Sequence, residues 1–335
     1  MFTTPVTHES QKESVLEMHA AALTDLRKKP VLILVKESKL GCDCLIRKAS
    51  EAEVLKQYEV EGVNPELILK AHKANQAAIL KARQLFPDAQ VFSLYRDNPT
   101  EISAAASNAG IVLAIGGDDH FKAAAQVARD SLLIAINSDP GRSVGALCTF
   151  QVEDLTAIKD NFESGEICFE EWSLLESALE TTEAGKRVIR KLPPAVSEIS
   201  LADKRSIYTF RANYELGLRH VPVKGSGLLV ANGAGSGGWF SSSSRYIFPL
   251  GRLWARTESR AEFVVREPYG EISKLEDVWG SFSVGETLRV TSSGNHEPEI
   301  SIDSVSNYSF PRGSSLLISL AKNGLKVLSR RTIED

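Results

Sequence analysis

The sequence predicts an α/β domain with a doubly wound parallel sheet, followed by an all-β, sandwich-like domain, and three observations favour this division. At 335 residues the chain is long enough for two hydrophobic cores, since a single core rarely grows past about 250 to 300 residues. Short, continuous apolar runs alternate with helical patterns in the first half, as expected for parallel strands buried on both faces. After about Phe150, Gly, Ser and Pro separate runs of alternating polarity, which is typical of antiparallel strands. We expect domains over 1–165 and 166–335, with the last residues able to pack back on the first.

Four apolar runs predict the strands of the parallel sheet, and they are Pro30–Val35, Ala89–Leu94, Ile111–Ile115 and Leu132–Ile136. Between them, apolar residues recur at intervals of three and four over Asn64–Phe86, which predicts a long helix. The same spacing predicts an amphipathic helix over Glu9–Lys28. Because strands and helices alternate, the connections are βαβ units, which favours a doubly wound sheet.

The second half carries alternating runs that begin at Ser206 ("SIYTFRANYEL"), Gly225 ("GSGLLVANG") and Ala261 ("AEFVVREP"). Later runs, "EISID", "SLLISLA" and "LKVLS", continue this pattern, so the chain is expected to end on strands.

Composition and charge exclude several kinds of partner. The formal net charge of −4 is spread along the chain without a basic run, so nucleic acid is not an expected partner. The apolar runs are far shorter than the roughly 20 residues that cross a bilayer, so no membrane span is predicted. The first residues lack the basic start and apolar stretch of a secretory signal, and we expect a cytoplasmic protein.

Four cysteines are too few for a disulfide framework in a chain of this length. Cys42 and Cys44 form a C-x-C pair, but no second Cys or His cluster follows that would complete a tetrahedral metal site. We interpret the thiols as structural, and the sequence identifies no metal site.

The strongest local signal is "LAIGGDDHFKAAAQVARD", in which a buried strand ends at Gly116 and Gly117 and a helix opens at Asp118. Ligands of open α/β sheets bind at the carboxyl ends of the strands. Two glycines let the backbone approach a phosphate, and a helix N-terminus offers unpaired N–H groups to an anion. Asp118 is then placed to accept a proton from an attacking hydroxyl. The alternative interpretation is a tight turn in which Asp118 or Asp119 only caps the helix.

This segment resembles the signature Gly-Gly-Asp-Gly-Thr of the NAD kinases, which Gly116, Gly117 and Asp118 match. After the next strand, "INSDPGRSVGALC" (136–148) is similar to the Asn-Thr-Asp-Pro-x-Arg-Ser-x-Gly segment of the mitochondrial-type branch of that family. "AVSEISLAD" (195–203) resembles the family's Asn-Glu motif, with Glu198 kept and Ser197 in place of Asn.

Two later segments extend the resemblance. "GSGLLVANGAGSGGWFSSSSRY" (225–246) is similar to the family's Gly-Ser-Thr-Ala-Tyr segment, with Trp239 at the aromatic position. "EISIDSVSNYSF" resembles the late Asp-Gly strand, with Asp303 kept. The segments occur in the family's order and cover roughly Val31 to Leu328, an ordered agreement that is more specific than any single motif.

The resemblance implies an enzyme that phosphorylates the 2′-hydroxyl of the adenosine ribose of NAD, bound between the two domains of a homodimer. It implies that Asp118 is the general base, with Mg²⁺ or another divalent cation and a phosphoryl donor as further requirements. The donor loop comprises Gly116, Gly117, Asp119 and His120. The residues expected to bind NAD are Asn137, Asp139, Arg142, Ser197, Glu198, Gly235, Ser236, Gly237, Gly238, Trp239 and Ser242.

Asp119 and His120 stand where the family has Gly and Thr. A bare carboxylate about 4 Å from a phosphate oxygen would repel it by roughly 4 kcal/mol at an effective dielectric of 20, unless Mg²⁺ or His120 compensates. In the related phosphofructokinases, a Gly-to-Asp change at this position accompanies the use of pyrophosphate, so ATP, pyrophosphate and polyphosphate are all candidate donors.

Two other functions stay open. A kinase relative that acts on a lipid or sugar hydroxyl is one, because diacylglycerol and sphingosine kinases share the Gly-Gly-Asp turn, although the Glu198 and Trp239 segments argue against it. A catalytically inactive NAD(P)-binding protein is the other, and Asp119 and Ser197 favour it.

Overall fold

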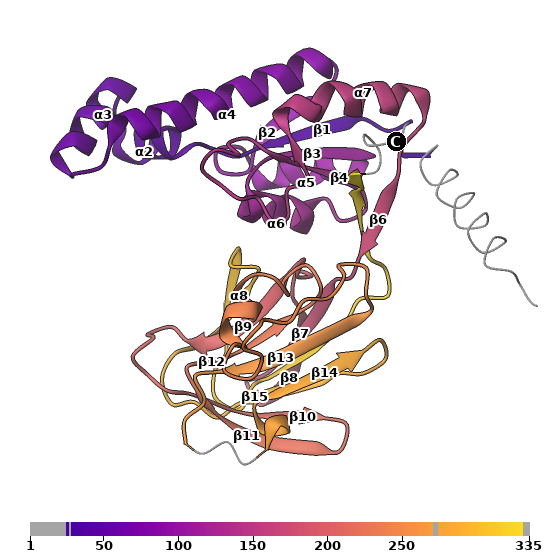
Figure 1. Cartoon of the computed structure of the whole chain (residues 1–335). Coiled ribbons are helices and arrows are strands. Elements are labelled where there is room, and N and C mark those ends of the chain that lie inside the picture. The colour runs from indigo at the N-terminus through magenta and orange to yellow at the C-terminus, as the bar shows by residue number, and fades with distance from the viewer. Residues whose placement is uncertain (1–24, 27, 271–273, 331–335) are drawn as a thin grey trace, which may run out of the picture. The chain divides into compact units, whose positions relative to one another are not determined.

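The computed structural model describes residues 25–330 apart from 27 and 271–273 (Figure 1). They form two compact units: one runs up to Glu170 and resumes at Lys326, and the other is Glu171–Leu325. The helix predicted over Glu9–Lys28 lies for the most part outside the described residues. None of the described helices combines the length and the apolar character that a bilayer-spanning helix needs.

The first unit contains the parallel sheet, whose strands follow the order β2-β1-β3-β4-β19-β6 in the described part of the chain. Its strands are β1 (Val31–Val35), β2 (Gln90–Ser93), β3 (Ile111–Gly116), β4 (Leu132–Asn137), β5 (Phe150–Gln151), β6 (Phe169–Trp172) and β19 (Leu325–Leu328). The four apolar runs of the sequence correspond to β1–β4, and β1 pairs in parallel with both β2 and β3. The predicted parallel sheet is therefore confirmed.

Helices cover both faces of this sheet, as a doubly wound arrangement requires. The described helices of this unit are α2 (Lys39–Arg47), α3 (Glu51–Val60), α4 (Pro65–Leu85), α5 (Pro99–Asn108), α6 (Asp118–Val127) and α7 (Leu155–Ser164), of which α2 and α3 pack against α4 in a hydrophobic cluster of their own. Figure 1 shows α4 and α7 on one face and α5 and α6 on the other. The long helix α4 begins after Asn64, whose side chain accepts hydrogen bonds from the backbone N–H groups of Glu66 and Leu67. This cap and Pro65 in the first turn explain why the helix starts there.

The second unit consists of two antiparallel sheets with strand orders β11-β10-β15-β18-β7-β8 and β14-β13-β12-β9-β16-β17 among its described residues. The strands of the first sheet are β7 (Leu175–Glu183), β8 (Lys186–Lys191), β10 (Phe210–Leu216), β11 (Arg219–Gly225), β15 (Leu288–Ser292) and β18 (Ser315–Leu320). Those of the second are β9 (Glu198–Asp203), β12 (Gly227–Ala231), β13 (Arg260–Arg266), β14 (Trp279–Ser283), β16 (Pro298–Ile302) and β17 (Ser306–Ser309). A short helix, α8 (Trp239–Ser243), follows β12.

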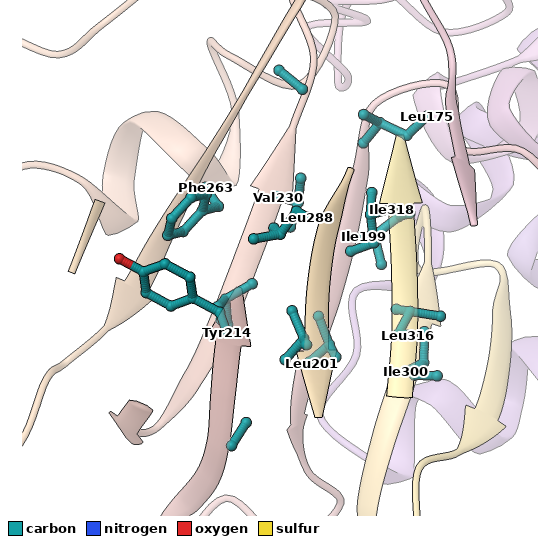
Figure 2. Close-up of a cluster of buried hydrophobic side chains, with 14 of the residues drawn as sticks. Leu175, Ile199, Leu201, Tyr214, Val230, Phe263, Leu288, Ile300, Leu316 and Ile318 are labelled. Atoms are coloured by element: carbon teal, nitrogen blue, oxygen red, sulfur yellow. The ribbon is translucent and has the colours of Figure 1, made fainter. Parts of the chain in front are cut away.

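The two sheets share one hydrophobic core, as expected for a sandwich. Figure 2 shows Leu175 and Leu316 of one sheet in the same cluster as Val230 and Ile300 of the other. All four side chains are fully buried. The predicted antiparallel β domain is confirmed.

Candidate functional site

The corner between β3 and α6 shows why a glycine stands at position 116. Gly117 is the N-cap residue of α6 and has an extended backbone, with φ −119° and ψ −170°. A Cβ atom on Gly116 would lie 2.7 Å from the Cβ of His120, so only glycine fits beside that ring. Because β1, β3 and β4 are parallel, the loops after their carboxyl ends meet at this corner.

A pocket of about 260 Å³ lies at this edge of the sheet. Its walls come from the loops after β1, β3 and β4 and from one side of α4. The lining residues are Lys36, Ser38, Lys39, Ile68, Ala71, Asn75, Gly116, Gly117, Asn137, Ser138, Asp139, Arg142 and Ser143. Lys36, Lys39 and Arg142 supply three positive charges against the one carboxylate of Asp139 among these lining residues, although the Lys39 ammonium also pairs with the Asp43 carboxylate at 2.8 Å. The pocket therefore favours an anion.

Asn137 braces the loop that forms one wall of this pocket. Its side-chain oxygen accepts a hydrogen bond from the Asp139 N–H at 3.1 Å, and its amide nitrogen donates to the Ser143 carbonyl at 2.9 Å. Arg142 ties the same loop to α4, since its guanidinium donates to the Leu67 carbonyl at 2.7 Å. Asn137 is buried and Arg142 is exposed. The structure thus brings Asn137, Asp139 and Arg142 together, beside the Gly116 turn.

Asp118 stands at the first position of α6, next to the pocket but outside its lining. Its two carboxylate oxygens accept hydrogen bonds from the backbone N–H groups of Ala146 and Leu147, at 2.9 and 2.8 Å. The residue is half-buried. These two bonds fix the plane of the carboxylate at the positive end of the helix dipole, and each oxygen keeps further acceptor capacity.

Asp119 is not the bare carboxylate that the sequence suggested. Its side chain is 87% exposed and forms an ion pair with the Lys122 ammonium at 3.0 Å. Solvent and this cation both screen its charge, so it would repel a donor phosphate less than the unscreened carboxylate considered from the sequence. Asp119 also lies outside the pocket lining.

The side chain of His120, which the sequence placed in the donor loop, points into the first unit. The ring is buried, and its Nε2 lies 2.9 Å from the Leu34 carbonyl oxygen of β1. Burial lowers the pKa of the imidazole to about 4. At neutral pH the ring is therefore uncharged and donates to the Leu34 carbonyl, and it packs against Gly116.

This buried histidine predicts a loss of stability in acid. The unfolded chain takes up a proton near pH 6.5, whereas the folded chain does so only near pH 4. Since the unfolded state binds more protons in this window, the free energy of unfolding should fall by roughly 3 kcal/mol from pH 7.5 to 4. In His120→Gln the side-chain amide can still donate to the Leu34 carbonyl, but it does not titrate. The free energy of unfolding of this variant, measured in urea, should therefore lack the histidine's fall between pH 7.5 and 4. Equal pH dependence in the two proteins would contradict the assignment.

In the second unit the predicted residues Ser197 and Glu198 lie at the start of β9, where Asp303 holds them. The Asp303 carboxylate accepts hydrogen bonds from the N–H groups of Val196, Ser197 and Glu198 and from the Ser197 hydroxyl. Ser197 is only 3% exposed. The Ser197 hydroxyl thus donates to Asp303 inside the protein, whereas the sequence predicted that Ser197 binds NAD.

Asn232, which the sequence analysis missed, joins two of the predicted segments. Its side-chain nitrogen donates to the carbonyls of Ser173 and Val196, at 2.6 and 2.9 Å. Its side-chain oxygen accepts from the N–H groups of Ala234 and Gly235. The residue is fully buried. The available signal was the Asn-Gly pair directly after a buried strand, which is a strong turn signature.

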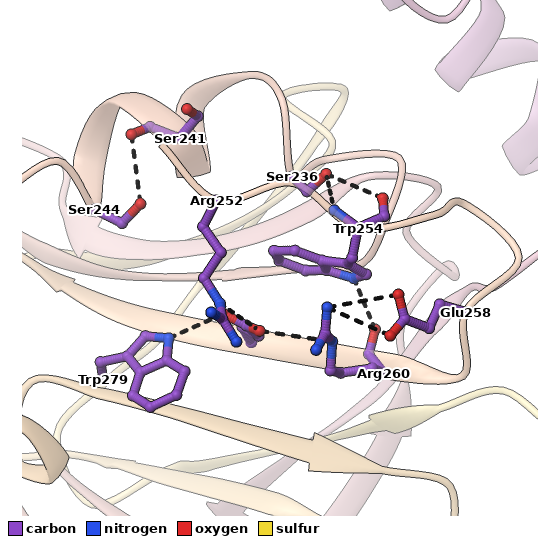
Figure 3. Close-up of polar contacts among 9 residues, drawn as sticks. Ser236, Ser241, Ser244, Arg252, Trp254, Glu258, Arg260 and Trp279 are labelled. Carbon is purple, nitrogen blue, oxygen red and sulfur yellow. Dashed lines mark hydrogen bonds and ion pairs between the residues drawn. The ribbon is translucent and has the colours of Figure 1, made fainter. Parts of the chain in front are cut away.

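The turn after Asn232 carries the other predicted residues. A Cβ on Gly235 would lie 2.3 Å from the Ser197 carbonyl oxygen, so this glycine lets the two segments touch. The Ser236 hydroxyl donates to the Gly233 carbonyl at 2.8 Å and lies against the Trp254 backbone (Figure 3). Gly237, Gly238 and Ser242 are exposed.

Trp239, at the start of α8, is 37% exposed, and the Arg266 guanidinium lies 4.4 Å from its ring centroid. Such a cation–π contact holds an exposed ring in place. The indole thus remains accessible beside Gly237 and Gly238.

A buried carboxylate, Glu262, anchors the long loop that follows α8. Arg252 Nε contacts both of its oxygens, at 2.8 and 2.7 Å, and the indole N–H of Trp279 donates at 3.0 Å. Arg260 Nε lies 3.6 Å away. Figure 3 shows Arg252, Arg260 and Trp279 in this network, beside Ser236 and Trp254. The loop that supports Ser236 is thereby fixed to β13 and β14.

No family model matches the chain, and no curated protein matches it in sequence. Its structure is similar to a crystal structure of yeast NADH kinase complexed with NADH. The similarity covers 91% of this chain and 84% of the yeast chain, with a TM-score of 0.62 and 11% sequence identity. At this identity the likeness shows a shared fold, an α/β unit followed by a β-sheet unit, as the sequence predicted.

Proposed function

We propose that this protein is a phosphotransferase that phosphorylates the 2′-hydroxyl of the adenosine ribose of NAD or NADH. The observation that carries the proposal is the cation-lined pocket beside a fixed carboxylate, Asp118, at the carboxyl edge of the parallel sheet. The fold that the chain shares with a kinase complexed with NADH supports a dinucleotide as the acceptor.

The pocket would hold the phosphoryl donor. Lys36, Lys39 and Arg142 line it and can neutralise phosphate oxygens, and Gly117 lets those oxygens approach the first N–H groups of α6. ATP, pyrophosphate and polyphosphate all present the oxygens that this set of donors binds. With Asp119 paired to Lys122 and exposed to solvent, that side chain disfavours ATP less than the sequence suggested.

Asp118 would accept the proton of the 2′-hydroxyl as its oxygen bonds to the terminal phosphorus of the donor. The bond from that phosphorus to the bridging oxygen breaks at the same time, and ADP, phosphate or the shortened polyphosphate leaves. Two backbone N–H groups hold the carboxylate without using all of its acceptor sites. A base held in this way does not have to be oriented during the reaction, which lowers the entropic part of the barrier.

The pocket offers Mg²⁺ what sites of phosphoryl transfer usually offer, a carboxylate beside the place proposed for the phosphates of the donor. Among the described residues no group of three or more His, Cys, Asp or Glu side chains forms a dedicated metal site. Mg²⁺ is commonly held by one or two carboxylates together with substrate phosphates, and Asp139 in the lining supplies one carboxylate. When bound, the ion would neutralise charge on the donor.

Glu198 and Trp239 would bind the dinucleotide, the carboxylate by accepting from ribose hydroxyls and the indole by offering an accessible flat face. Glu198 is 8% exposed and Trp239 is 37% exposed. The homodimer and the cytoplasmic location expected from the sequence remain part of the proposal.

The second candidate is an inactive NAD(P)-binding relative. It is favoured by the use of both Asp118 oxygens in bracing the 146–147 backbone and by the burial of Ser197 where the family has Asn. In such a protein Asp118 would serve only to hold the loop.

The phosphotransferase and the inactive NAD(P)-binding protein are distinguished by whether a phosphorylated product forms. Purified protein is incubated with Mg²⁺, NAD or NADH, and ATP, pyrophosphate or polyphosphate, and products are separated by chromatography. Parallel reactions contain diacylglycerol or sphingosine as the acceptor. We expect a phosphorylated dinucleotide with at least one donor. Dinucleotide binding by calorimetry without any product would favour the inactive relative, and product only from a lipid acceptor would refute NAD(H) as the substrate.

A further inference from the structure

We propose that Asp303 and Asn232 are positioning residues that clamp the 196–198 segment, so that Glu198 keeps the orientation in which it binds the dinucleotide ribose. This inference rests on the proposed function, because it concerns the acceptor half of the same reaction. It gives a role to two fully buried polar side chains that come from different loops of the second unit, the turn between β16 and β17 and the connection after β12.

Asp303 holds the segment from one side. Its carboxylate accepts from the N–H groups of Val196 at 2.7 Å, Ser197 at 2.8 Å and Glu198 at 3.1 Å. The Ser197 hydroxyl adds a fourth bond at 2.8 Å. In return, the Asp303 N–H donates to the Glu198 carbonyl at 2.9 Å. Three consecutive amides thus converge on one carboxylate, which compensates the charge of a side chain with no exposed surface.

Asn232 holds the same segment from the other side. Its side-chain nitrogen donates to the Val196 carbonyl at 2.9 Å, and its backbone N–H donates to the Ser197 carbonyl at 3.2 Å. Every backbone N–H and carbonyl of residues 196–198 therefore has a partner. With the backbone fixed at both edges, the direction in which the Glu198 side chain leaves the chain is set before any ligand arrives, which lowers the ordering cost of binding.

The backbone around Asp303 is shaped for this contact. Asp303 and Ser304 have φ angles of 55° and 58°. They are the central residues of the turn that the Val305 N–H closes on the Ile302 carbonyl at 2.9 Å, in the three-residue connection 303–305 between β16 and β17. Positive φ at both central residues matches the twist of a tight hairpin, and Asp tolerates it better than most residues. The turn directs the carboxylate toward the start of β9, which pairs with β16.

The chain offers a matched control at the opposite end of the same strands. Asp203, at the end of β9, is 8% exposed, and its carboxylate accepts from the backbone N–H groups of Arg205 and Glu297. Asp203→Asn therefore disturbs the same kind of bond on the same pair of strands, away from Glu198.

In Asp303→Asn the new amide nitrogen is itself a hydrogen-bond donor. It would face backbone N–H groups whose hydrogen bonds the carboxylate had accepted. We expect KM for NAD(H) to rise about tenfold or more, with KM for the phosphoryl donor unchanged within about twofold, because binding is lost on the acceptor side only. Hydrogen exchange should also show lost protection at the amides of 196–198. Asp203→Asn should leave both KM values and that protection unchanged.

Ser197→Ala serves as a milder variant should Asp303→Asn fold poorly, since it removes one of the four bonds to the carboxylate. It should raise KM for NAD(H) about threefold without altering KM for the donor. Equal effects of Asp303→Asn and Asp203→Asn would overturn the inference, as would an unchanged KM for NAD(H) in Ser197→Ala. Wild-type protein that neither binds nor phosphorylates NAD(H) would instead refute the proposed function, so the two failures are distinguishable.

Discussion

Replacing Asp118 with Asn is expected to lower kcat for phosphorylation of NAD(H) by about a hundredfold to ten-thousandfold, the range for loss of a general base. The amide cannot take the proton of the attacking hydroxyl. It can still accept one of the two backbone N–H bonds from Ala146 and Leu147, so the 145–147 loop should keep its course. Steady-state rates at saturating NAD(H) and donor measure the effect.

The neighbouring residue provides the control. Asp119 lies in the same first turn of α6 and carries the same charge, but its side chain is 87% exposed and paired with Lys122. Asp119→Asn should therefore change kcat by less than about threefold, as expected for a screened surface charge. Comparable losses in both variants would mean that the charge near the helix start, and not a proton acceptor, supports the reaction.

Replacing Glu262 with Ala is expected to lower the free energy of unfolding by about 3–5 kcal/mol, the usual cost of removing one partner of a buried ion pair. The variant leaves the guanidinium groups of Arg252 and Arg260, whose side chains are 33% and 30% exposed, without their shared carboxylate. It also removes the acceptor of the Trp279 indole N–H. Urea unfolding followed by tryptophan fluorescence measures the change.

Glu258 is the matched control, because it pairs with the same Arg260 but its side chain is 43% exposed. Glu258→Ala should lower the free energy of unfolding by at most about 1 kcal/mol, as exposed ion pairs do. If Glu262→Ala is as stable as Glu258→Ala, the buried network does not anchor the loop.

Local patterns were sufficient to predict the sheet of the first unit. The runs that became β1, β3 and β4 are apolar at nearly every position because both faces of these strands are buried, whereas β2 is only partly buried. The ends of α4 were predicted within one residue, since Asn64 and Pro65 are start signals of their own. The helices α2 and α3 were missed, although Ser50 and Glu53 form a capping box at the start of α3.

The site was harder to predict because its contacts join residues far apart in the chain. Nothing local indicates that the Asp118 carboxylate meets the 146–147 backbone or that Asp303 meets 196–198. His120 follows a phosphate-loop signature, yet the helix turns its ring toward β1, where the Leu34 carbonyl accepts a hydrogen bond from the ring. Motif spacing indicates which residues gather, whereas packing decides which of them face a ligand.

The most direct test of the central claim is to locate the new phosphate on the dinucleotide. Wild-type protein is incubated with NAD(H), Mg²⁺ and the best donor, and the product is characterised by mass spectrometry and phosphorus NMR. We expect one added phosphate as a monoester on the 2′-oxygen of the adenosine ribose. A phosphate on any other hydroxyl, or no phosphorylated dinucleotide from any donor, would contradict the account.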